Sequence, residues 1–329
     1  MPVPPHPLSE LLTPHLRALA KTSPAVARQF LGDAAEALAT ADDLADPIGD
    51  AAHSPLPGLV HRYPDRVLLL PTMACAAHCR FCFRRDRVGA RGMTDDQIDA
   101  ALAYVAARSQ IREVILSGGD PLTLPQSRLV PLLARLDAIE SVETVRIHTR
   151  LAVHDPARAT RVAQTLAPER RTALWIALHV NHADELSPET NTAIRALHAA
   201  GAFLVAQTVL LAGINDDAET LSTLFRALVR LGVKPYYLHH PDRAAGTEHF
   251  RVPIAKGRAL VETLRGTLSG LAQPTYVLDI PGGHGKVWAT DAYVTPAPGG
   301  GWTARAVDGS RHAYPADADA EVAVAPPKC

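Results

Sequence analysis

Short apolar runs alternate with longer amphipathic segments along most of the chain. The apolar runs have the length of strands, and the segments between them carry hydrophobic residues at helical spacing. The predicted strands cover residues 66–72, 112–119, 143–149, 172–180, 203–211, 233–240 and 274–280. The predicted helices cover residues 93–109, 127–139, 155–167, 187–201, 216–232 and 253–270, and Thr94 is the expected N-cap of the first. This alternation predicts right-handed βαβ units and a mainly parallel sheet.

About six or seven such units predict an α/β fold with a partial or complete parallel (β/α) barrel. An open doubly wound sheet stays open as an alternative, because periodicity does not fix the order of the strands. Polar clusters help to choose, since CRFCFRR, SGGD, HTR, HVNH, HHPD and DIPGGHGK all follow predicted strands. In a parallel barrel these positions converge on the C-terminal face, where such folds form their active sites. We therefore expect one shared site.

Three regions are expected along the chain. Residues 1–55 are rich in Ala and Leu, and the segments LSELLTPHLRALA and AVARQFLGDAAEALATA predict a helical N-terminal region. Residues 56–287 would form the barrel. Residues 288–329 are rich in Pro, Gly, Ala and acidic residues, which predicts a short edge element followed by a disordered tail.

Composition and charge narrow the class of protein. Hydrophobic residues make up 47% of the chain and charged residues 20%, as in ordinary globular proteins. The formal net charge of -1 gives no electrostatic reason to expect nucleic acid as a partner. No apolar run approaches the ~20 residues that span a bilayer, and the segment MPVPPHPLSELL lacks the features of a secretory signal. We expect a cytoplasmic protein without a membrane partner.

Three of the four cysteines lie close together, spaced C-x3-C-x2-C as Cys75, Cys79 and Cys82. Clustered thiols in an intracellular chain favour a metal site over a disulfide. A [4Fe–4S] cluster needs thiolates on three irons and can leave the fourth iron open for another ligand. A zinc site with His78 as fourth ligand is the alternative, although His78 and Cys79 are neighbours that cannot easily occupy two vertices of one tetrahedron. The spacing favours the cluster and leaves zinc open.

The cysteine spacing, with Phe81 just before the third cysteine, resembles the radical S-adenosylmethionine (SAM) superfamily. In that superfamily the open iron binds SAM, and an electron from the cluster cleaves SAM to methionine and a 5′-deoxyadenosyl radical. The segment LSGGD follows the next predicted strand and matches the superfamily's glycine-rich segment. The resemblance implies that Ser117, Gly118, Gly119 and Asp120 bind SAM. Taken alone, this segment would be an ordinary strand-to-helix turn.

A larger set of segments resembles the lysine 2,3-aminomutase family, from about Tyr63 to Lys286. These segments are YPDRVLLL, CRFCFRR, ILSGGDPL, VRIHTR, HVNHADE, QTVLLAGIND, PYYLHHPD, GTEHFRVP, LRGTLSG and DIPGGHGK. Members of the family combine the cluster and SAM with pyridoxal 5′-phosphate (PLP). The resemblance implies an isomerase that moves the α-amino group of L-lysine to C3 to give L-β-lysine. It also implies an electron donor such as flavodoxin or ferredoxin.

The resemblance assigns roles to five further residues. Lys286, at the end of PGGHGK, matches the lysine that holds PLP and would be the catalytic residue. Arg66 matches a position for the PLP phosphate, which suits a planar guanidinium. Arg84 matches the residue that binds the substrate carboxylate. Asp242 and Asp279 match the pair that holds the side-chain ammonium of lysine, and two acids with one carboxylate-binding arginine fit a long dicationic amino acid.

The chain departs from the larger free-lysine enzymes at its C-terminal end. Those enzymes carry additional cysteines that bind zinc between subunits, whereas this chain has only Cys329 outside the motif. Its oligomeric state, a homo-oligomer included, therefore stays open. The length is closer to the branch of the family that forms (R)-β-lysine for the modification of a lysine of elongation factor P. Asp279 and Pro281 favour free lysine, since that branch has Glu near the position of Asp279 and lacks an intact Pro-Gly-Gly. Another basic amino acid as substrate, and a non-enzymatic zinc-binding module, are the remaining alternatives.

Overall fold

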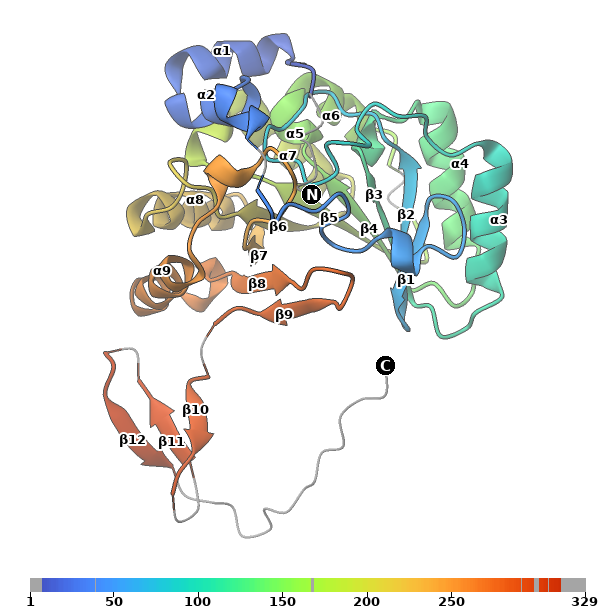
Figure 1. The fold of residues 1–329 in the computed structure, drawn as a ribbon. Helices are drawn as coiled ribbons and strands as arrows, with labels where there is room; N and C mark the ends of the chain where they lie inside the picture. The colour runs from blue at the N-terminus through green and yellow to red at the C-terminus, as the bar shows by residue number, and fades with distance from the viewer. Residues whose placement is uncertain are drawn as a thin grey trace.

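The fold is built on one large curved sheet. The computed structural model describes residues 8–38, 40–166, 169–290, 292–298, 302–306 and 308–314. Within these residues, nine strands pair in the sequential order β1 to β9 (Figure 1). The strands are β1 (Leu59–Tyr63), β2 (Arg66–Thr72), β3 (Glu113–Gly118), β4 (Thr144–Thr149), β5 (Ala173–His179), β6 (Phe203–Val209), β7 (Lys234–His239), β8 (Thr275–Asp279) and β9 (Lys286–Trp288).

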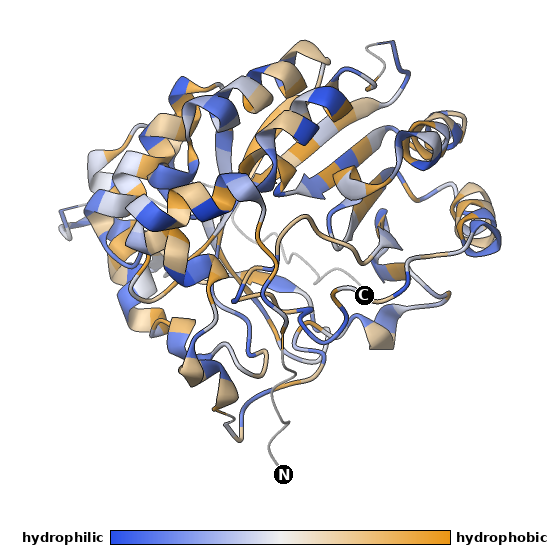
Figure 2. Ribbon diagram, turned by 90° about the horizontal axis from the view of Figure 1, so that it is seen from above, coloured by the Kyte–Doolittle hydropathy of each residue, from blue (hydrophilic) through white to orange (hydrophobic). Residues whose placement is uncertain are grey.

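Strands β2 to β8 are parallel, and β1 and β9 are antiparallel edges. The sequential order rules out the doubly wound alternative, in which the strand order reverses at a switch point. No ladder joins β1 to β9 in the described chain, so the sheet is an open half-barrel (Figure 2). The predicted α/β barrel is therefore confirmed in its partial form. The sequence pattern did not predict the two short edge strands.

Helices that follow the parallel strands cover the outer face of the sheet (Figure 2). They are α3 (Asp95–Ala106), α4 (Gln126–Asp137), α5 (Leu151–His154), α6 (Pro156–Ala163), α7 (Pro188–Ala199), α8 (Ala218–Arg230) and α9 (Ile254–Thr267). Helix α8 shows why they pack there, because its buried residues Leu221, Leu224, Phe225 and Leu228 fall on one helical face. The predicted N-cap Thr94 is confirmed, and it forms a capping box with Gln97 at the start of α3.

The N-terminal helices are shorter than the pattern predicts. Helix α1 covers Pro14–Thr22, helix α2 covers Pro24–Phe30, and two short 3-10 turns, Ala34–Ala37 and Ala51–His53, follow them. Ser23 accepts from Val26 N and starts α2, with a proline at the first helical position. The apolar periodicity continues past residue 30, but the backbone leaves the helix at Leu31 in an extended conformation.

Residues 42–54, here called the strap, link the N-terminal helices to β1. The strap is part of the blue segment that crosses the front of the sheet in Figure 1. Leu44 N donates to Arg243 O at 2.8 Å, and His53 Nε2 lies 2.9 Å from Gly283 O. The strap is thus joined to the loops that follow β7 and β8.

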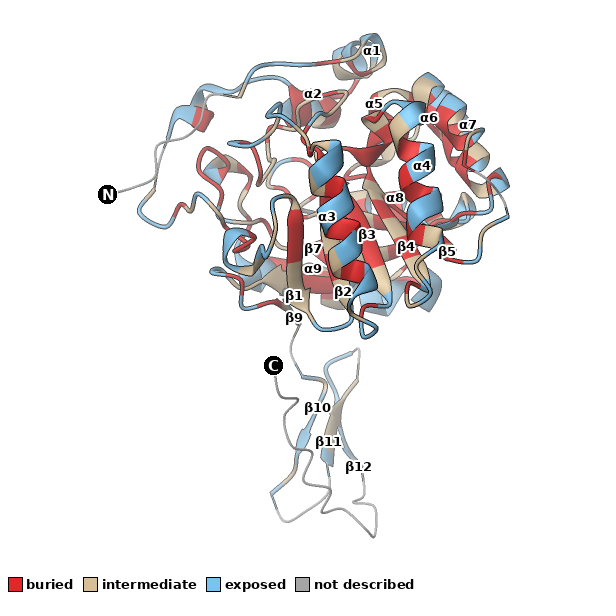
Figure 3. Cartoon of the chain, turned by 90° about the vertical axis from the view of Figure 1, so that its right-hand side faces the viewer, coloured by how far each residue is buried: buried red, intermediate tan, exposed pale blue. Residues whose placement is uncertain are grey.

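A second, separate sheet follows the half-barrel along the chain. It consists of β10 (Val294–Pro296), β11 (Trp302–Arg305) and β12 (Arg311–Tyr314), all antiparallel, and it lies below the half-barrel in Figure 3. The domain boundaries predicted from sequence stay predictions. The end of the predicted tail, residues 315–329 with Cys329, lies outside the described residues. No described helix is long and apolar enough to cross a membrane.

Candidate active site

One cavity on the inner side of the half-barrel is lined by every site residue predicted from the sequence. Its volume is about 1100 Å³. The predicted residues on its wall are Cys75, Cys79, Cys82, Arg66, Arg84, Ser117, Gly118, Gly119, Asp120, Asp242, Asp279 and Lys286. Most of them lie at or after the C-terminal ends of β2, β3, β7 and β8, where a parallel barrel forms its site. Their functional roles stay predictions.

The three cysteines of the motif lie on the loop after β2 as free thiols. Burial and the nearby Cys79 raise the pKa of Cys82 to about 12, and burial also raises the pKa of Cys75 and of Cys79. Thiols in such surroundings become thiolates when a cationic metal centre compensates their charge. In the described chain no three His, Cys, Asp or Glu side chains converge on one metal ion. Three free thiols on one loop suit a multi-iron cluster, which takes thiolates on three of its irons.

Two glycines let the turn after β3 pack directly against the cysteine loop. Gly118 has a φ of +103°, which favours glycine. A Cβ on Gly119 would lie 2.4 Å from Ala74 O, and Asp120 N donates to that same oxygen at 2.8 Å. The backbone of this turn is therefore fixed to the loop that carries Cys75.

The carboxylate of Asp120 orders the loops around it. It accepts from Thr149 Oγ1 and Arg150 N, both at 2.8 Å, and from Leu122 N at 3.0 Å. These donors offset part of the cost of burying the charge, and burial still raises the pKa of Asp120. The carboxylate thus joins the turn after β3 to the end of β4. Its predicted contact with SAM stays a prediction.

Arg84 is oriented by a carboxylate from the strap. Its Nε and Nη2 donate to Asp50 Oδ2 at 3.0 and 2.8 Å. Its Nη1 donates to Ser117 Oγ at the longer distance of 3.4 Å. Both charged groups are buried, so this ion pair is held in low dielectric. Asp50 thus fixes one side of the guanidinium and leaves Nη1 toward the cavity.

Lys286 lies directly across a hairpin from Asp279. The two residues are partners in the β8–β9 ladder, and their side chains form an ion pair. Lys286 Nζ also lies 3.4 Å from His239 Nδ1, and Lys286 N donates to Tyr63 Oη at 2.9 Å. The turn between the strands has three glycines with positive φ, namely Gly282, Gly283 and Gly285. The PGGHG sequence therefore sets which side chains meet at the end of β8.

Asp242, on the loop after β7, has no hydrogen bond or ion pair within the described residues. Burial and the nearby Asp279 carboxylate raise the pKa of Asp242 to about 7, against the opposite effect of Lys286 and Arg84. A cationic group bound next to Asp242 would stabilise the ionised form of this carboxylate.

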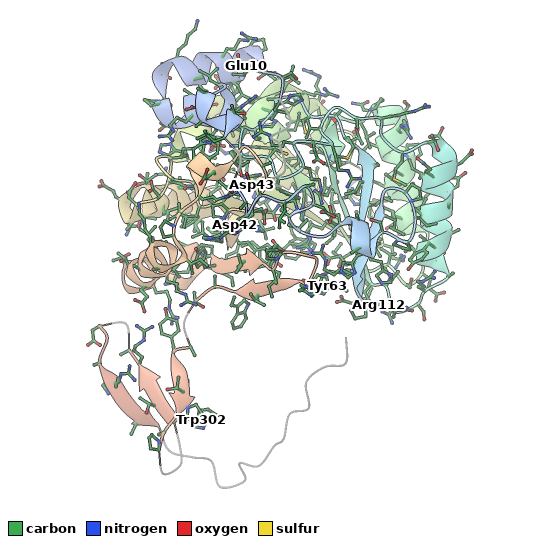
Figure 4. All side chains as sticks on the ribbon, in the orientation of Figure 1. Glu10, Asp42, Asp43, Tyr63, Arg112 and Trp302 are labelled. Carbon is green, nitrogen blue, oxygen red and sulfur yellow. The ribbon has the colours of Figure 1, made fainter. Side chains whose placement is uncertain are left out.

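Arg66 lies at the other end of β2 from the cysteines. Its Nη1 pairs with Asp65 at 2.7 Å, and its guanidinium stacks 3.9 Å from the ring centre of Tyr63, which is labelled in Figure 4. Arg62 and Arg146 line the same cavity. Positive side chains of this kind suit a phosphate group.

Three residues that shape the site were not predicted from the sequence. They are Asp50 in the strap, Arg150 after β4 and His239 at the end of β7. They contact Arg84, Cys79 and Lys286, respectively. The polar clusters HTR and HHPD contain Arg150 and His239, so strand-end position was a usable signal for both. Nothing in the local pattern around Asp50 indicated a contact with the cysteine loop.

Comparison with known proteins places this site in a family. A family model described as the radical SAM superfamily matches residues 69–224. L-lysine 2,3-aminomutase of Fusobacterium nucleatum is 44% identical over 254 residues, which cover 77% of this chain and 60% of that protein. The enzyme of the same name from Clostridium subterminale is 41% identical over 82% of this chain and 65% of its own. The chain thus spans less than two thirds of the length of these two relatives.

A relative of similar length is also found. The putative L-lysine 2,3-aminomutase of Treponema pallidum is 37% identical over 320 residues, covering 94% of this chain and 90% of that protein. Among solved structures, a radical SAM methyltransferase from Sphaerobacter thermophilus has a TM-score of 0.47 and 19% identity over 67% of this chain and 68% of its own. The sequence similarities show that the chain belongs to the radical SAM superfamily and, within it, to the lysine 2,3-aminomutase family.

Proposed function

We propose that this chain is a PLP-dependent radical SAM aminomutase that moves the α-amino group of L-lysine to C3 and so forms L-β-lysine. One observation carries the proposal: a single cavity brings together three free thiols, the Arg84 guanidinium, and the carboxylates of Asp242 and Asp279 beside Lys286. The thiols suit a cluster, and the charged groups suit an amino acid with a cationic side chain.

The residues present fit the three cofactors of the family. Cys75, Cys79 and Cys82 would hold the [4Fe–4S] cluster, and the turn from Ser117 to Asp120 would contact SAM. Lys286 would hold PLP, with Arg66 near the PLP phosphate. When bound, the cluster and SAM supply a 5′-deoxyadenosyl radical, and PLP supplies the π-system to which the migrating nitrogen is attached.

Arg84 would bind the substrate carboxylate through Nη1. Asp50 already occupies Nε and Nη2, so the carboxylate would be held at one defined position instead of across the whole guanidinium. Holding the substrate in this way places C2 and C3 at a fixed distance from the radical source, and such positioning lowers the entropic part of the barrier.

Asp242 and Asp279 would bind the ammonium at the far end of the substrate. The Lys286 ammonium on Asp279 shows that this carboxylate can hold an amino group in the cavity. Asp279 would take the substrate ammonium when Lys286 moves away from it, together with Asp242, which has no partner among the described residues. Two carboxylates would repel the side chain of glutamate, which gives selectivity for a basic amino acid.

The elongation factor P branch of the same family is the second candidate, because it also isomerises lysine. Against it stand Asp279 and Pro281. Free L-lysine is therefore the substrate we propose.

The test is anaerobic reconstitution with iron and sulfide, followed by incubation with PLP, SAM, dithionite and one substrate. L-lysine and L-arginine are compared as substrates. The proposal expects β-lysine from free L-lysine. Formation of the (R) enantiomer of β-lysine in place of L-β-lysine would support the second candidate, and a colourless, iron-free protein that binds zinc would refute both.

A further inference from the structure

Arg150 makes a direct contact with one of the three cysteines. It follows β4 and precedes α5, it is only 5% exposed, and its Nη1 donates to Cys79 Sγ at 2.9 Å. The other two thiols receive main-chain contacts, from Asp120 for Cys75 and from Arg84 for Cys82. Among the three cysteines, Cys79 is therefore the one whose sulfur accepts a hydrogen bond from a charged side chain of the described residues.

The guanidinium of Arg150 is held in place on its other side. Its Nη2 donates to Glu185 Oε2 at 2.8 Å and to Gln29 Oε1 at 2.5 Å. The rings of Phe30 and Phe81 lie 4.7 and 5.2 Å from the guanidinium carbon. Polar contacts and aromatic packing together leave the group little freedom to turn away from the sulfur.

Glu185 is itself fixed by backbone donors. It is fully buried, and its Oε1 accepts from Asn181 N at 3.0 Å and from His182 N at 2.9 Å. Gln29 Nε2 donates to the same oxygen at 2.9 Å. The network therefore runs from helix α2 through the loop after β5 to the cysteine motif, and it places one cation and one anion at defined positions near Cys79.

We propose that Arg150 sets the reduction potential of the cluster by holding a charged hydrogen bond on the Cys79 thiolate, and that Glu185 opposes it. This inference rests on the proposed function, since it requires the cluster. Reduction adds one electron, from a low-potential one-electron donor, to the cluster and its thiolates, and no bond forms or breaks. A hydrogen bond and a positive charge at a ligand sulfur stabilise the more negative reduced state and raise the potential. A nearby carboxylate acts in the opposite direction.

The test is a redox titration of the reconstituted protein, followed by electron paramagnetic resonance, without SAM or lysine. Arg150→Met should make the equilibrium constant for reduction about tenfold smaller, which lowers the reduction potential by about 59 mV for a one-electron couple. Its iron content should be unchanged. In Glu185→Gln, which keeps the acceptor for Asn181 and His182, we expect a shift toward higher potential. Arg128→Gln is the control, because that arginine pairs with Asp95 at the surface.

Two further variants separate charge from hydrogen bonding and guard against misfolding. The double variant Arg150→Met with Glu185→Gln keeps the net charge of the site, so a remaining downward shift reports the lost hydrogen bond. Arg150→Lys keeps the charge without the planar fork, and we expect an intermediate potential. Equal potentials in wild type, Arg150→Lys and Glu185→Gln, each with a full cluster, would overturn the inference. A wild-type protein that assembles no cluster would instead overturn the proposed function.

Discussion

Asp242 and Asp279 are carboxylates in the same cavity, but they differ in their partners. Asp279 is paired with Lys286, whereas Asp242 has no partner among the described residues and its pKa is raised to about 7 by burial and by Asp279. The raised pKa means that protonated and ionised forms of Asp242 coexist near neutral pH. Since only the ionised form attracts an ammonium group, the titration of Asp242 should be visible in substrate binding.

The first prediction concerns the pH dependence of lysine binding. As the pH rises through about 7, Asp242 loses its proton, so the affinity for L-lysine should rise, and binding below that pH should release a proton. Asp242→Asn should bind lysine at least about tenfold more weakly, given ~1.5–3 kcal/mol for a hydrogen bond to a charged group, without the pH step. Calorimetry on the PLP-loaded enzyme without reductant, in two buffers of different ionisation enthalpy, measures both effects.

Asp42→Asn serves as the control, because Asp42 is exposed and pairs with Arg243 at the surface. An Asp242→Asn enzyme with wild-type affinity and the same pH step would show that this carboxylate does not bind the substrate.

The second prediction separates the two cofactor sites. Lys286→Ala should lose the absorbance of bound PLP and all turnover, while it keeps the iron content and the spectrum of the reduced cluster. The hairpin should persist, because the bond to Tyr63 comes from the backbone nitrogen of residue 286. Lys256→Ala, at an exposed ion pair with Asp216, is the matched control. Normal turnover by Lys286→Ala would refute the assignment.

At the scale of elements, the turn after β3 and the cysteine loop act as one unit. Backbone hydrogen bonds join them at Thr72 O and Ala74 O, and Gly119 leaves no room for a side chain. The glycine-rich segment therefore has a packing role in addition to any contact with SAM. That packing role can be tested in the absence of cofactors.

The third prediction concerns this packing. In Gly119→Ala the new Cβ would meet backbone atoms of residues 73 and 74, which cannot move as a flexible side chain would. We expect a loss of about 1–3 kcal/mol in the free energy of unfolding and lower iron incorporation. Urea denaturation and iron analysis measure these effects. Gly270→Ala should change neither, because nothing lies within 4 Å of a Cβ at Gly270, and equal behaviour of the two variants would contradict the account.

The elements that could be predicted from the sequence are those whose apolar residues follow a clear strand or helix pattern. Strand β3, with Val114, Ile115 and Leu116 all buried, reads as a continuous apolar run between a helix and a polar turn. Strand β9 has three residues, and Trp288 is 78% exposed, so it carries no such pattern. The position of the strap could not be predicted either. It depends on contacts with residues far away in the sequence, such as Arg243 and Gly283, and not on the spacing of apolar residues within the strap.

For the whole molecule, the half-barrel explains how residues far apart in the sequence come to share one cavity. Parallel strands end at the same rim, so loops after β2, β3, β4, β7 and β8 meet there. The sequence predicted this convergence and the residues on the cavity wall. It could not predict the pairing within the cavity, such as Asp50 with Arg84 or Arg150 with Cys79, because pair contacts between loops depend on the closed three-dimensional arrangement.

The measurement that tests the central claim most directly follows the nitrogen itself. L-lysine with a heavy nitrogen isotope at the α-position and a heavy carbon isotope at C3 is incubated anaerobically with the reconstituted protein, SAM, PLP and dithionite. Nuclear magnetic resonance should then show a new one-bond coupling between the labelled nitrogen and C3. If the nitrogen stays on C2 in a protein that carries its full complement of iron and PLP, the chain is not a lysine 2,3-aminomutase.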